Sequence, residues 1–252
     1  DFHGQPLKSA ADFENLLRKI DKSAVVVKSV LGTQGKGVYI FEQIRRGTEG
    51  VDLISASGEH QTAAEFARRI SSAALTKAHL IQERIRQHPD LDKIFDGSLN
   101  SIRIATLRQP NGEPYFWFAG LRTGVKPGPD NISQGGLAID IDMKTGVLGL
   151  GGYNYLPMTE KTKVHPSSGF DFYGMKIPYW DEILKLVEKA ARCMPFFVGV
   201  GWDVAISETG PLLLEGNDGF GVVLAQIHRP NGLLTDEVMD IIEHYGLKKF
   251  KR

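Results

Sequence analysis

Apolar residues recur at helical spacing in four stretches of the chain, each of which begins with a residue that favours a helix start. In the first stretch, Phe13, Leu16 and Leu17 follow a capping box that begins at Ser9. The predicted helices run from Ser9 through Ile20, from Thr62 to about Lys77, from Pro178 to about Met194 and from Thr235 to about Gly246.

β-Hairpins are the other element that the pattern predicts, and they outnumber strand-helix-strand units. The predicted strands cover 24–28 and 38–43, 80–85, 100–109 and 113–124, the two arms of 137–154 and the two arms of 201–219, with a weaker hairpin at 44–57. This order predicts an α+β fold with mainly antiparallel sheets. A break near residue 79 divides it into a small lobe, 1–79, and a larger lobe, 80–252, and ligands often bind in a cleft between lobes.

The last hairpin, GWDVAISETGPLLLEGNDG, carries polar residues where core side chains would be expected. If its turn is centred on Thr209, Glu215 faces Asp203, and Asn217 lies two residues further along on the same face. Two facing carboxylates repel and lose hydration among apolar neighbours, so a positive group is expected between them. All the donor atoms are oxygens, which suits Mg²⁺ or Mn²⁺ better than zinc. The alternative is that both carboxylates are solvated on an open sheet face.

Three glycines separate the predicted strands in the run AVVVKSVLGTQGKGVYIFE. A Walker motif is excluded because no Ser or Thr follows Gly35-Lys36, and a dinucleotide fingerprint is excluded because the loop enters a strand. What remains is a glycine-rich flap whose backbone N–H groups close over phosphate oxygens, with Lys28 reaching the same phosphates. The alternative is an ordinary turn beside a surface lysine.

Two further strands carry candidate binding groups. The strand LIQERI could offer backbone groups to an adenine edge, although an ordinary edge strand explains it equally well. Arg103 is expected on the opposite face from Ile102 and Ile104, and Arg122 on the partner strand is expected to share that face. Two guanidinium groups near a dicarboxylate metal site would neutralise a transferring phosphoryl group. For Arg122, an exposed surface role is the alternative.

Composition narrows the class of protein. The 252 residues, 42% of them hydrophobic, are enough for the core of one large domain or two small lobes. Thirty basic residues balance thirty acidic ones, which gives no signature of a nucleic-acid or membrane partner. No apolar run is long enough to span a membrane and the start is not a signal peptide, so we expect a cytoplasmic protein. The single cysteine, Cys193, excludes an internal disulfide and is expected to be a buried structural thiol.

These segments, in this order, resemble the ATP-grasp superfamily over nearly the whole chain. The resemblance runs from VVVKSVLGTQGKGV through LIQERI and NSIRIA to GWDVAISETGPLLLEGN. The chain is most similar to the sugar-transfer-associated and glutamate-ligase-like ATP-grasp domains, because HPSSGFDFYGMKIPYWDEI precedes VGWDVAI and LLEGN. The resemblance implies two lobes that clamp ATP, with Mg²⁺ or Mn²⁺ as the metal.

The resemblance also implies roles for individual residues. Arg103 would stabilise the phosphoryl centre, with Arg122 as the second catalytic candidate. The ligands of two Mg²⁺ ions would be Asp203, Glu215 and Asn217. The phosphate loop and the adenine hinge would supply Lys28, Gly32, Gln34, Gly35, Lys36, Gly37, Gln82, Glu83 and Ile85. Superfamily members usually carry a further N-terminal region with another phosphate-contacting lysine, for which Lys8 is a poor substitute.

The expected activity is ATP-dependent carboxylate-amine ligation on small-molecule or peptide substrates. A carboxylate attacks the γ-phosphate to give an acylphosphate and ADP, and an amine then displaces phosphate to form an amide. Two alternatives stay open. One is an ATP-dependent phosphotransferase on the same scaffold, and the other is a nucleotide-binding module without catalysis.

Overall fold

The computed structural model describes residues 9–30, 37–55, 57–72, 78–127, 135–153, 161–229 and 232–246. The chain divides into two compact units, Asp1–Ile85 and Arg86–Arg252. The predicted boundary at residue 79 comes earlier than this division, because the strand that begins at His79 pairs with a strand of the first unit.

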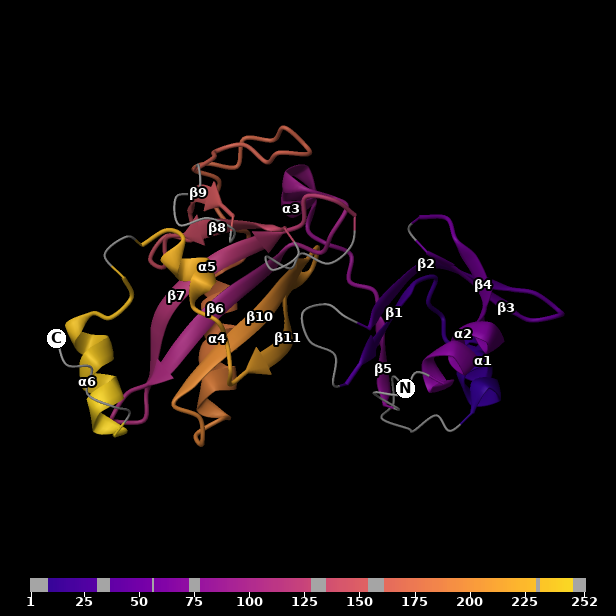
Figure 1. Ribbon diagram of the computed structural model, residues 1–252, viewed down its shortest axis with the longest axis horizontal. Coiled ribbons are helices and arrows are strands. Elements are labelled where there is room, and N and C mark those ends of the chain that lie inside the picture. Colours follow the sequence, from indigo (N-terminus) through magenta and orange to yellow (C-terminus); the bar gives the residue numbers. More distant parts are fainter. Residues whose placement is uncertain are drawn as a thin grey trace. The chain divides into compact units, whose positions relative to one another are not determined.

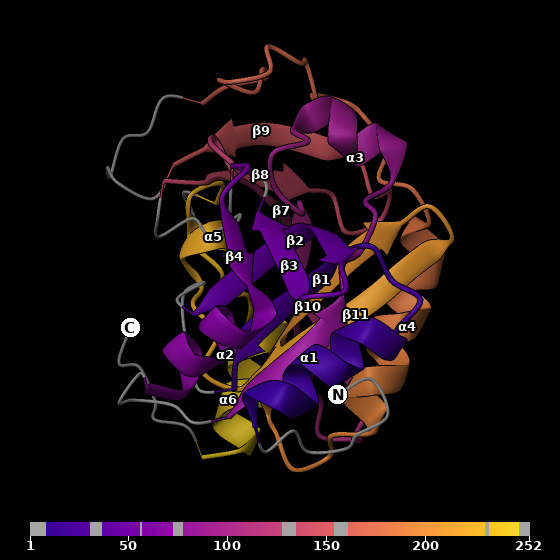
Figure 2. The ribbon, with the colours of Figure 1, turned by 90° about the vertical axis from the view of Figure 1, so that its right-hand side faces the viewer.

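The first unit contains a five-stranded antiparallel sheet and two helices, counted over the residues that the structure describes. The strand order is β4-β3-β2-β1-β5. The elements are α1 (Ala10–Lys19), β1 (Val25–Ser29), β2 (Val38–Arg46), β3 (Val51–Ser55), β4 (His60–Thr62), α2 (Ala63–Ser72) and β5 (His79–Glu83). Figure 2 shows α1 and α2 together against these strands.

Capping and alternation explain how the first unit is built. The hydroxyl of Ser9 accepts a hydrogen bond from the backbone N–H of Asp12, which confirms the predicted start of α1. In β1, Val25 and Val27 are fully buried under the two helices. Side chains alternate along a strand, so Lys28 belongs to the opposite face, which these helices do not cover.

The second unit contains a six-stranded antiparallel sheet in the order β11-β10-β6-β7-β8-β9, again counted over the described part of the chain. Its strands are β6 (Ser101–Arg108), β7 (Pro114–Thr123), β8 (Leu137–Ile141), β9 (Leu148–Gly152), β10 (Gly199–Ser207) and β11 (Gly210–Asn217). Its helices are α3 (Pro89–Ile94), α4 (Trp180–Arg192), α5 (Val223–Gln226) and α6 (Asp236–His244). Within this unit, labelled in Figure 1, the prediction of an α+β class with antiparallel sheets is confirmed.

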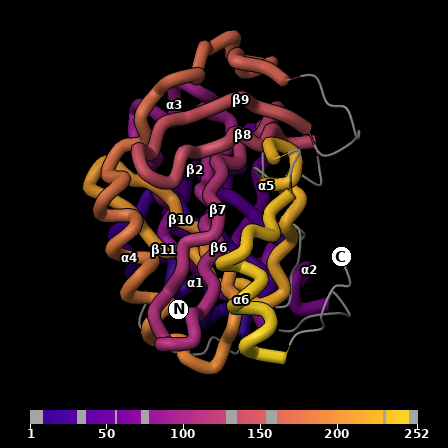
Figure 3. Tube along the Cα trace, turned by 90° about the vertical axis from the view of Figure 1, so that its left-hand side faces the viewer, coloured from indigo at the N-terminus to yellow at the C-terminus, as the bar shows by residue number. Residues whose placement is uncertain are grey.

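The two faces of this sheet are covered by different helices. Figure 3 shows α4 on one side and α5 and α6 on the other. The α4 side buries Ile102 and Ile104 of β6. The other side buries Ala105 of the same strand together with Leu224 of α5. Because Arg103 alternates with Ile102 and Ile104 and shares the parity of Ala105, it lies on the α5 side of the sheet.

Three predictions about local structure in or next to helices were wrong in detail. The polar connection after residue 85 contains α3, whose first turn is capped by the imidazole of His88. Helix α4 begins at Trp180 with Tyr179 in the left-handed conformation (φ 57°) as its N-cap, so Pro178 lies before the helix. Cys193, at the C-cap of α4, is exposed and is not a buried thiol. Helix α2 ends at Ser72, and the predicted extension to residue 77 lies outside the described residues.

Among the helices that the structure describes, none is both long enough and apolar enough to cross a membrane.

Candidate functional site

The turn of the β10-β11 hairpin differs from the prediction. Ser207 pairs with Gly210, so the loop is the two residues Glu208 and Thr209 and is not centred on Thr209. The hydroxyl of Ser207 accepts from the backbone N–H of Thr209 at 3.2 Å and donates to the carbonyl of Gly210 at 2.9 Å. Gly210 has a φ of +130°, which a residue with a side chain rarely adopts.

A β-bulge restores the pairing that the sequence predicted for the polar residues. The register shifts by one between Asp203 and Val204, with Leu214 as the extra residue on β11. Beyond the bulge, Asp203 faces Glu215, and Asn217 pairs with Gly201 two residues further along the ladder. The predicted pair is therefore present, but it depends on an irregularity that the sequence did not reveal.

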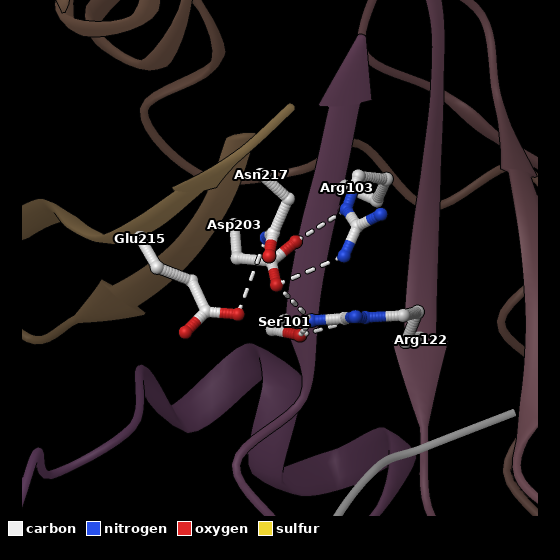
Figure 4. Close-up of polar contacts among 6 residues, drawn as sticks. All are labelled: Ser101, Arg103, Arg122, Asp203, Glu215 and Asn217. Atoms are coloured by element: carbon white, nitrogen blue, oxygen red, sulfur yellow. Dashed lines mark hydrogen bonds and ion pairs between the residues drawn. The ribbon is translucent and has the colours of Figure 1, made fainter. Parts of the chain in front are cut away.

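Asp203 lies at the centre of an ion-pair cluster, which Figure 4 shows. Only 3% of Asp203 is exposed. The guanidinium of Arg103 donates from Nε to Oδ1 at 2.5 Å and from Nη2 to Oδ2 at 3.0 Å. Nη2 of Arg122 lies 3.0 Å from Oδ2. Burial by itself raises the pKa of Asp203, but the charges and hydrogen bonds of Arg122 and Arg103 outweigh it and hold the pKa below its usual value.

Ser101 positions the second arginine. Its hydroxyl accepts from Nε of Arg122 at 3.1 Å and from Nη2 at 2.6 Å. Ser101 pairs directly with Arg122 across β6 and β7, and it shares a face with Arg103 because it lies two positions before Arg103 along β6. Ser101 was not among the residues predicted for the site, although its alternation with Ile102 was a usable signal.

Glu215 and Asn217 lie at the edge of this cluster (Figure 4). Glu215 is exposed, and the side-chain amide of Asn217 donates to its Oε1 at 3.2 Å. The two carboxylates and two guanidiniums of the cluster have a formal net charge of zero. The expectation of a positive group beside the facing carboxylates is met for Asp203 by the two arginines, which compensate its charge.

The donor set fits a hard divalent cation. Glu215 and Asn217 present oxygen atoms near the protein surface, and Oδ1 of Asp203, which has one hydrogen bond to Arg103, keeps a lone pair. Mg²⁺ typically binds one or two carboxylates and retains several waters. Across the described residues no group of three or more His, Cys, Asp or Glu side chains is placed to hold a metal ion, so the candidate donor set is two carboxylates and an amide.

A glycine makes room for Arg103. A Cβ on Gly201 would lie 2.5 Å from Cβ of Phe220 and 3.3 Å from Cδ of Arg103. Any side chain at Gly201 would therefore displace Phe220 or the arginine from the face that carries Asp203. The sequence analysis did not assign either Gly201 or Phe220 to the site.

The candidate phosphate-binding lysine lies in the first unit. Lys28 pairs with Val38 on one side and with Leu80, which is 46% exposed, on the other. At the end of the loop, the backbone N–H of Ser29 donates to the carbonyl of Gly37 at 3.0 Å. Gly37 has a φ of +76°, and a Cβ there would lie 3.1 Å from Cβ of Ser29, so glycine is favoured at this position. Gly32, Gln34, Gly35 and Lys36 lie outside the described residues.

The predicted adenine hinge is an edge strand with polar side chains. Gln82 is exposed and pairs with Val26, on the face of the sheet that carries Lys28. Glu83 is also exposed, and its carboxylate accepts from the ammonium of Lys22 at 2.7 Å. Ile85 is half-buried at the end of the first unit. The adenine contact remains a prediction for all three predicted hinge residues.

Comparison with known proteins places the chain in a family. The profile described as sugar-transfer associated ATP-grasp matches residues 3–241. The chain belongs to this ATP-grasp family. The resemblance drawn from its motifs is thereby confirmed. A comparison of this ATP-grasp chain with curated proteins finds no match.

Two solved structures share the fold. The biotin carboxylase domain of 2-oxoglutarate carboxylase from Hydrogenobacter thermophilus, in complex with MgADP, ADP and bicarbonate, is 13% identical with a TM-score of 0.51, and the match covers 98% of this chain and 41% of that one. N5-carboxyaminoimidazole synthetase from Staphylococcus aureus, in complex with ADP, is 9% identical with a TM-score of 0.51. This match covers 96% of this chain and 46% of the synthetase chain. The ATP-grasp chain thus spans less than half the length of these relatives, and the likeness shows the fold alone.

Proposed function

We propose that this ATP-grasp chain catalyses ATP-dependent ligation of a carboxylate to an amine through an acylphosphate. The observation that carries the proposal is the cluster in which Asp203 fixes Arg103 and Arg122 beside the oxygens of Glu215 and Asn217. A cluster of this kind suits a reaction in which negative charge must be positioned and neutralised.

The arginines would hold the transferring phosphoryl group. Asp203 engages Nε and Nη2 of Arg103, and since a guanidinium has five N–H donors, donors remain for phosphoryl oxygens. Because Asp203 and Ser101 fix both guanidiniums in advance, little side-chain entropy is lost when an anion binds.

The acidic edge of the cluster would hold the metal. When bound, Mg²⁺ would neutralise phosphate charge, and Glu215 and Asn217 are the residues placed to bind it, with Oδ1 of Asp203 as a further contact. The relatives with ADP and MgADP support this assignment as an analogy of fold. We assign Lys28 to the nucleotide phosphates, because it is a cation on the face of its sheet that α1 and α2 do not cover.

The reaction needs no nucleophile from the protein. A substrate carboxylate oxygen attacks the γ-phosphorus and ADP leaves with the electron pair of the broken P–O bond. The amine nitrogen then forms the C–N bond, phosphate leaves the acyl carbon, and the nitrogen loses its proton. The contribution of the protein is to orient two anions that repel each other and to balance the developing charge.

Product analysis tests the proposal. The chain is incubated with Mg²⁺-ATP and pools of carboxylates and amines, with uronic acids and amino sugars included because of the family to which it belongs. ADP release should require both pools, and mass analysis should find an amide. With hydroxylamine in place of the amine, a hydroxamate should form. A stable phosphorylated product would instead identify a phosphotransferase, and ATP binding without turnover in any pool would identify a binding module.

A further inference from the structure

A second group of charged residues lies on the same sheet face as the proposed phosphoryl site. Asp140 on β8 pairs with Gly120 on β7, Gly120 pairs with Arg103 on β6, and Arg103 pairs with Asp203 on β10. Residues directly opposite each other on neighbouring strands project to the same face. Two steps of about 4.8 Å put the backbone of Asp140 roughly 10 Å from that of Arg103.

Helix α5 lies over the row between these two residues. A Cβ on Gly120 would lie 2.1 Å from Cδ2 of Leu224, so the missing side chain at Gly120 is what allows α5 to approach the sheet. Leu224 is buried together with Ala138 in the apolar cluster on this face. The apolar contact fixes α5 and the residues that follow it.

Two hydrogen bonds bring basic residues to Asp140 from elsewhere in the chain. His228 bonds through Nε2 to the carbonyl of Ala138 at 3.1 Å, two residues before Asp140 on the same strand. The ammonium of Lys161 donates to the carbonyl of Ile227, next to His228. Arg229 follows directly, and its charge and that of Lys161 both act on Asp140.

The charges of this group are not fully paired with one another. Burial raises the pKa of Asp140, and the charges of Arg229 and Lys161 act against that rise. Among the described residues, no Lys, Arg or His nitrogen lies within 4.0 Å of the Asp140 carboxylate, in contrast to Asp203. Burial, followed by the charge of Lys161, lowers the pKa of His228 to about 4, so this imidazole is neutral at pH 7. Asp140, Lys161 and Arg229 together have a formal net charge of +1, and the charge of Asp142 also acts on Asp140.

We propose that Asp140, Lys161 and Arg229 form the subsite for the acceptor amine, and that this acceptor is a small zwitterion, an α-amino acid. The inference rests on the ligase function proposed above. Lys161 and Arg229 would bind the acceptor carboxylate, and Asp140 would accept hydrogen bonds from its amino group.

The mixture of charges decides between acceptor classes. A simple anion would be repelled by Asp140, and a simple amine would leave the two cations without an anionic partner. An acceptor with both charges satisfies all three groups, which is the usual basis of discrimination at a polar site.

Matched acceptors test the inference. ADP release and amide formation are measured with α-amino acids, with the amines that lack the carboxylate and with the acids that lack the amine, each with the carboxylate pool that supports turnover. The value of kcat/KM should be at least about tenfold higher for the best amino acid than for its decarboxylated amine. Equal or better use of the simple amine would overturn the subsite.

Substitutions at Lys161 provide the second arm. Lys161→Met should raise the KM for the amino acid about tenfold, and more than it raises the KM for ATP, whereas Lys161→Arg should retain most of the affinity because it keeps the charge. Lys163→Met is the matched control, since Lys163 is exposed on the same segment and its ammonium lies over the ring of Tyr173. If Lys161→Met and Lys163→Met had equal KM values for the amino acid, the subsite would be wrong.

The hydroxylamine reaction of the unmodified chain separates the two proposals. If no carboxylate gives a hydroxamate, the ligase function itself fails. If a hydroxamate forms but amino acids are not preferred, the ligase function stands and the acceptor subsite is overturned.

Discussion

Two carboxylates that face each other across the β10-β11 hairpin have opposite surroundings. Asp203 is buried and paired with two arginines, whereas Glu215 is exposed and contacts the amide of Asn217. Asp203 therefore has a structural part in holding the guanidiniums, and Glu215 is the carboxylate that remains available to a cation. Substitution of Asp203 and substitution of Glu215 should therefore have different consequences, although the two residues form a pair in the sequence pattern.

We expect Glu215→Gln to abolish ATP turnover and to leave the fold unchanged. The substitution removes a negative charge from the metal-binding edge but no volume from a core, because Glu215 is exposed. ADP release and the thermal midpoint measure the two effects. Glu208→Gln is the control, since Glu208 is exposed in the turn of the same hairpin. Wild-type turnover in Glu215→Gln with Mg²⁺ would contradict the metal assignment.

Lys28→Ala should weaken nucleotide binding by about tenfold or more with little loss of stability. Lys28 is half-buried on the face of the first sheet that α1 and α2 do not cover. Its replacement therefore removes a charge without opening a cavity. Titration of ATP by calorimetry measures the affinity, and a melt without nucleotide measures stability. Lys19→Ala is the control, since Lys19 is an exposed lysine in the last turn of α1. A lower melting temperature with unchanged affinity would show that Lys28 is structural.

His228 should make stability depend on pH below neutrality. Its folded-state pKa of about 4 lies below the ordinary 6.5, so the unfolded chain binds the proton more readily. The stabilisation is complete above about pH 6.5 and decreases as the pH falls toward 4. Urea unfolding should show a loss of about 2 kcal/mol between pH 7.5 and pH 5 from this residue.

His228→Gln is the matching variant, because its amide keeps a donor for the carbonyl of Ala138 without titrating. The pH slope should be flatter in His228→Gln and unchanged in His60→Gln, where the histidine is exposed. Equal slopes in all three proteins would disprove the assignment.

At the scale of elements, one buried side chain organises the start of the second unit. Nε2 of Gln87 donates to Oδ1 of Asp92 at 2.8 Å and lies within hydrogen-bonding distance of the carbonyls of Phe95 and Ser98. Its Oε1 accepts from the backbone N–H of Asn100 at 2.5 Å. Gln87 thus joins α3 to the residue that precedes β6, the strand that carries Ser101 and Arg103.

Gln87→Ala should destabilise the second unit by about 2 to 4 kcal/mol. The substitution leaves the buried backbone N–H of Asn100 without its partner and removes a donor from the carbonyls of Phe95 and Ser98, which costs more than the loss of an exposed hydrogen bond. Urea unfolding followed by tryptophan fluorescence measures the effect, with Gln226→Ala on the exposed side of α5 as the control. A change below 0.5 kcal/mol, no larger than in the control, would refute this role.

At the scale of the whole molecule, the two units have separate apolar cores. The ring of Phe66 is fully buried in the first unit, within about 6 Å of Phe13, Tyr39 and Phe41. Phe172 is fully buried in the second. All three tryptophans belong to the second unit, so their fluorescence reports on that unit.

Phe66→Ala should destabilise the first unit by about 3 to 5 kcal/mol and leave the tryptophan transition nearly unchanged. Hydrogen exchange by mass spectrometry should find faster exchange throughout the first unit and unchanged exchange in the second. Phe172→Ala is the reciprocal variant and should shift the tryptophan transition. If Phe66→Ala moved that transition as far as Phe172→Ala does, the two units would unfold as one cooperative body.

The sequence by itself determined the class of fold, the helix starts at Ser9 and Thr235 and the sheet faces of Lys28 and Arg103. These properties depend on local periodicity and capping, so Ser9, Lys28 and Arg103 could be placed from their neighbours along the chain. The missed helix α3 has only six residues, too few to carry a clear helical period.

The tertiary structure decided which partners the polar groups find. The bulge at Leu214 sets the pair of Asp203 and Glu215, and Ser101 and Arg122 complete the cluster from strands that the order of the sheet brings together. The approach of α5 to Asp140 likewise depends on Gly120, far away in the sequence. Strand register and long-range packing fix these contacts, and neither is encoded in the spacing of residues within a single element.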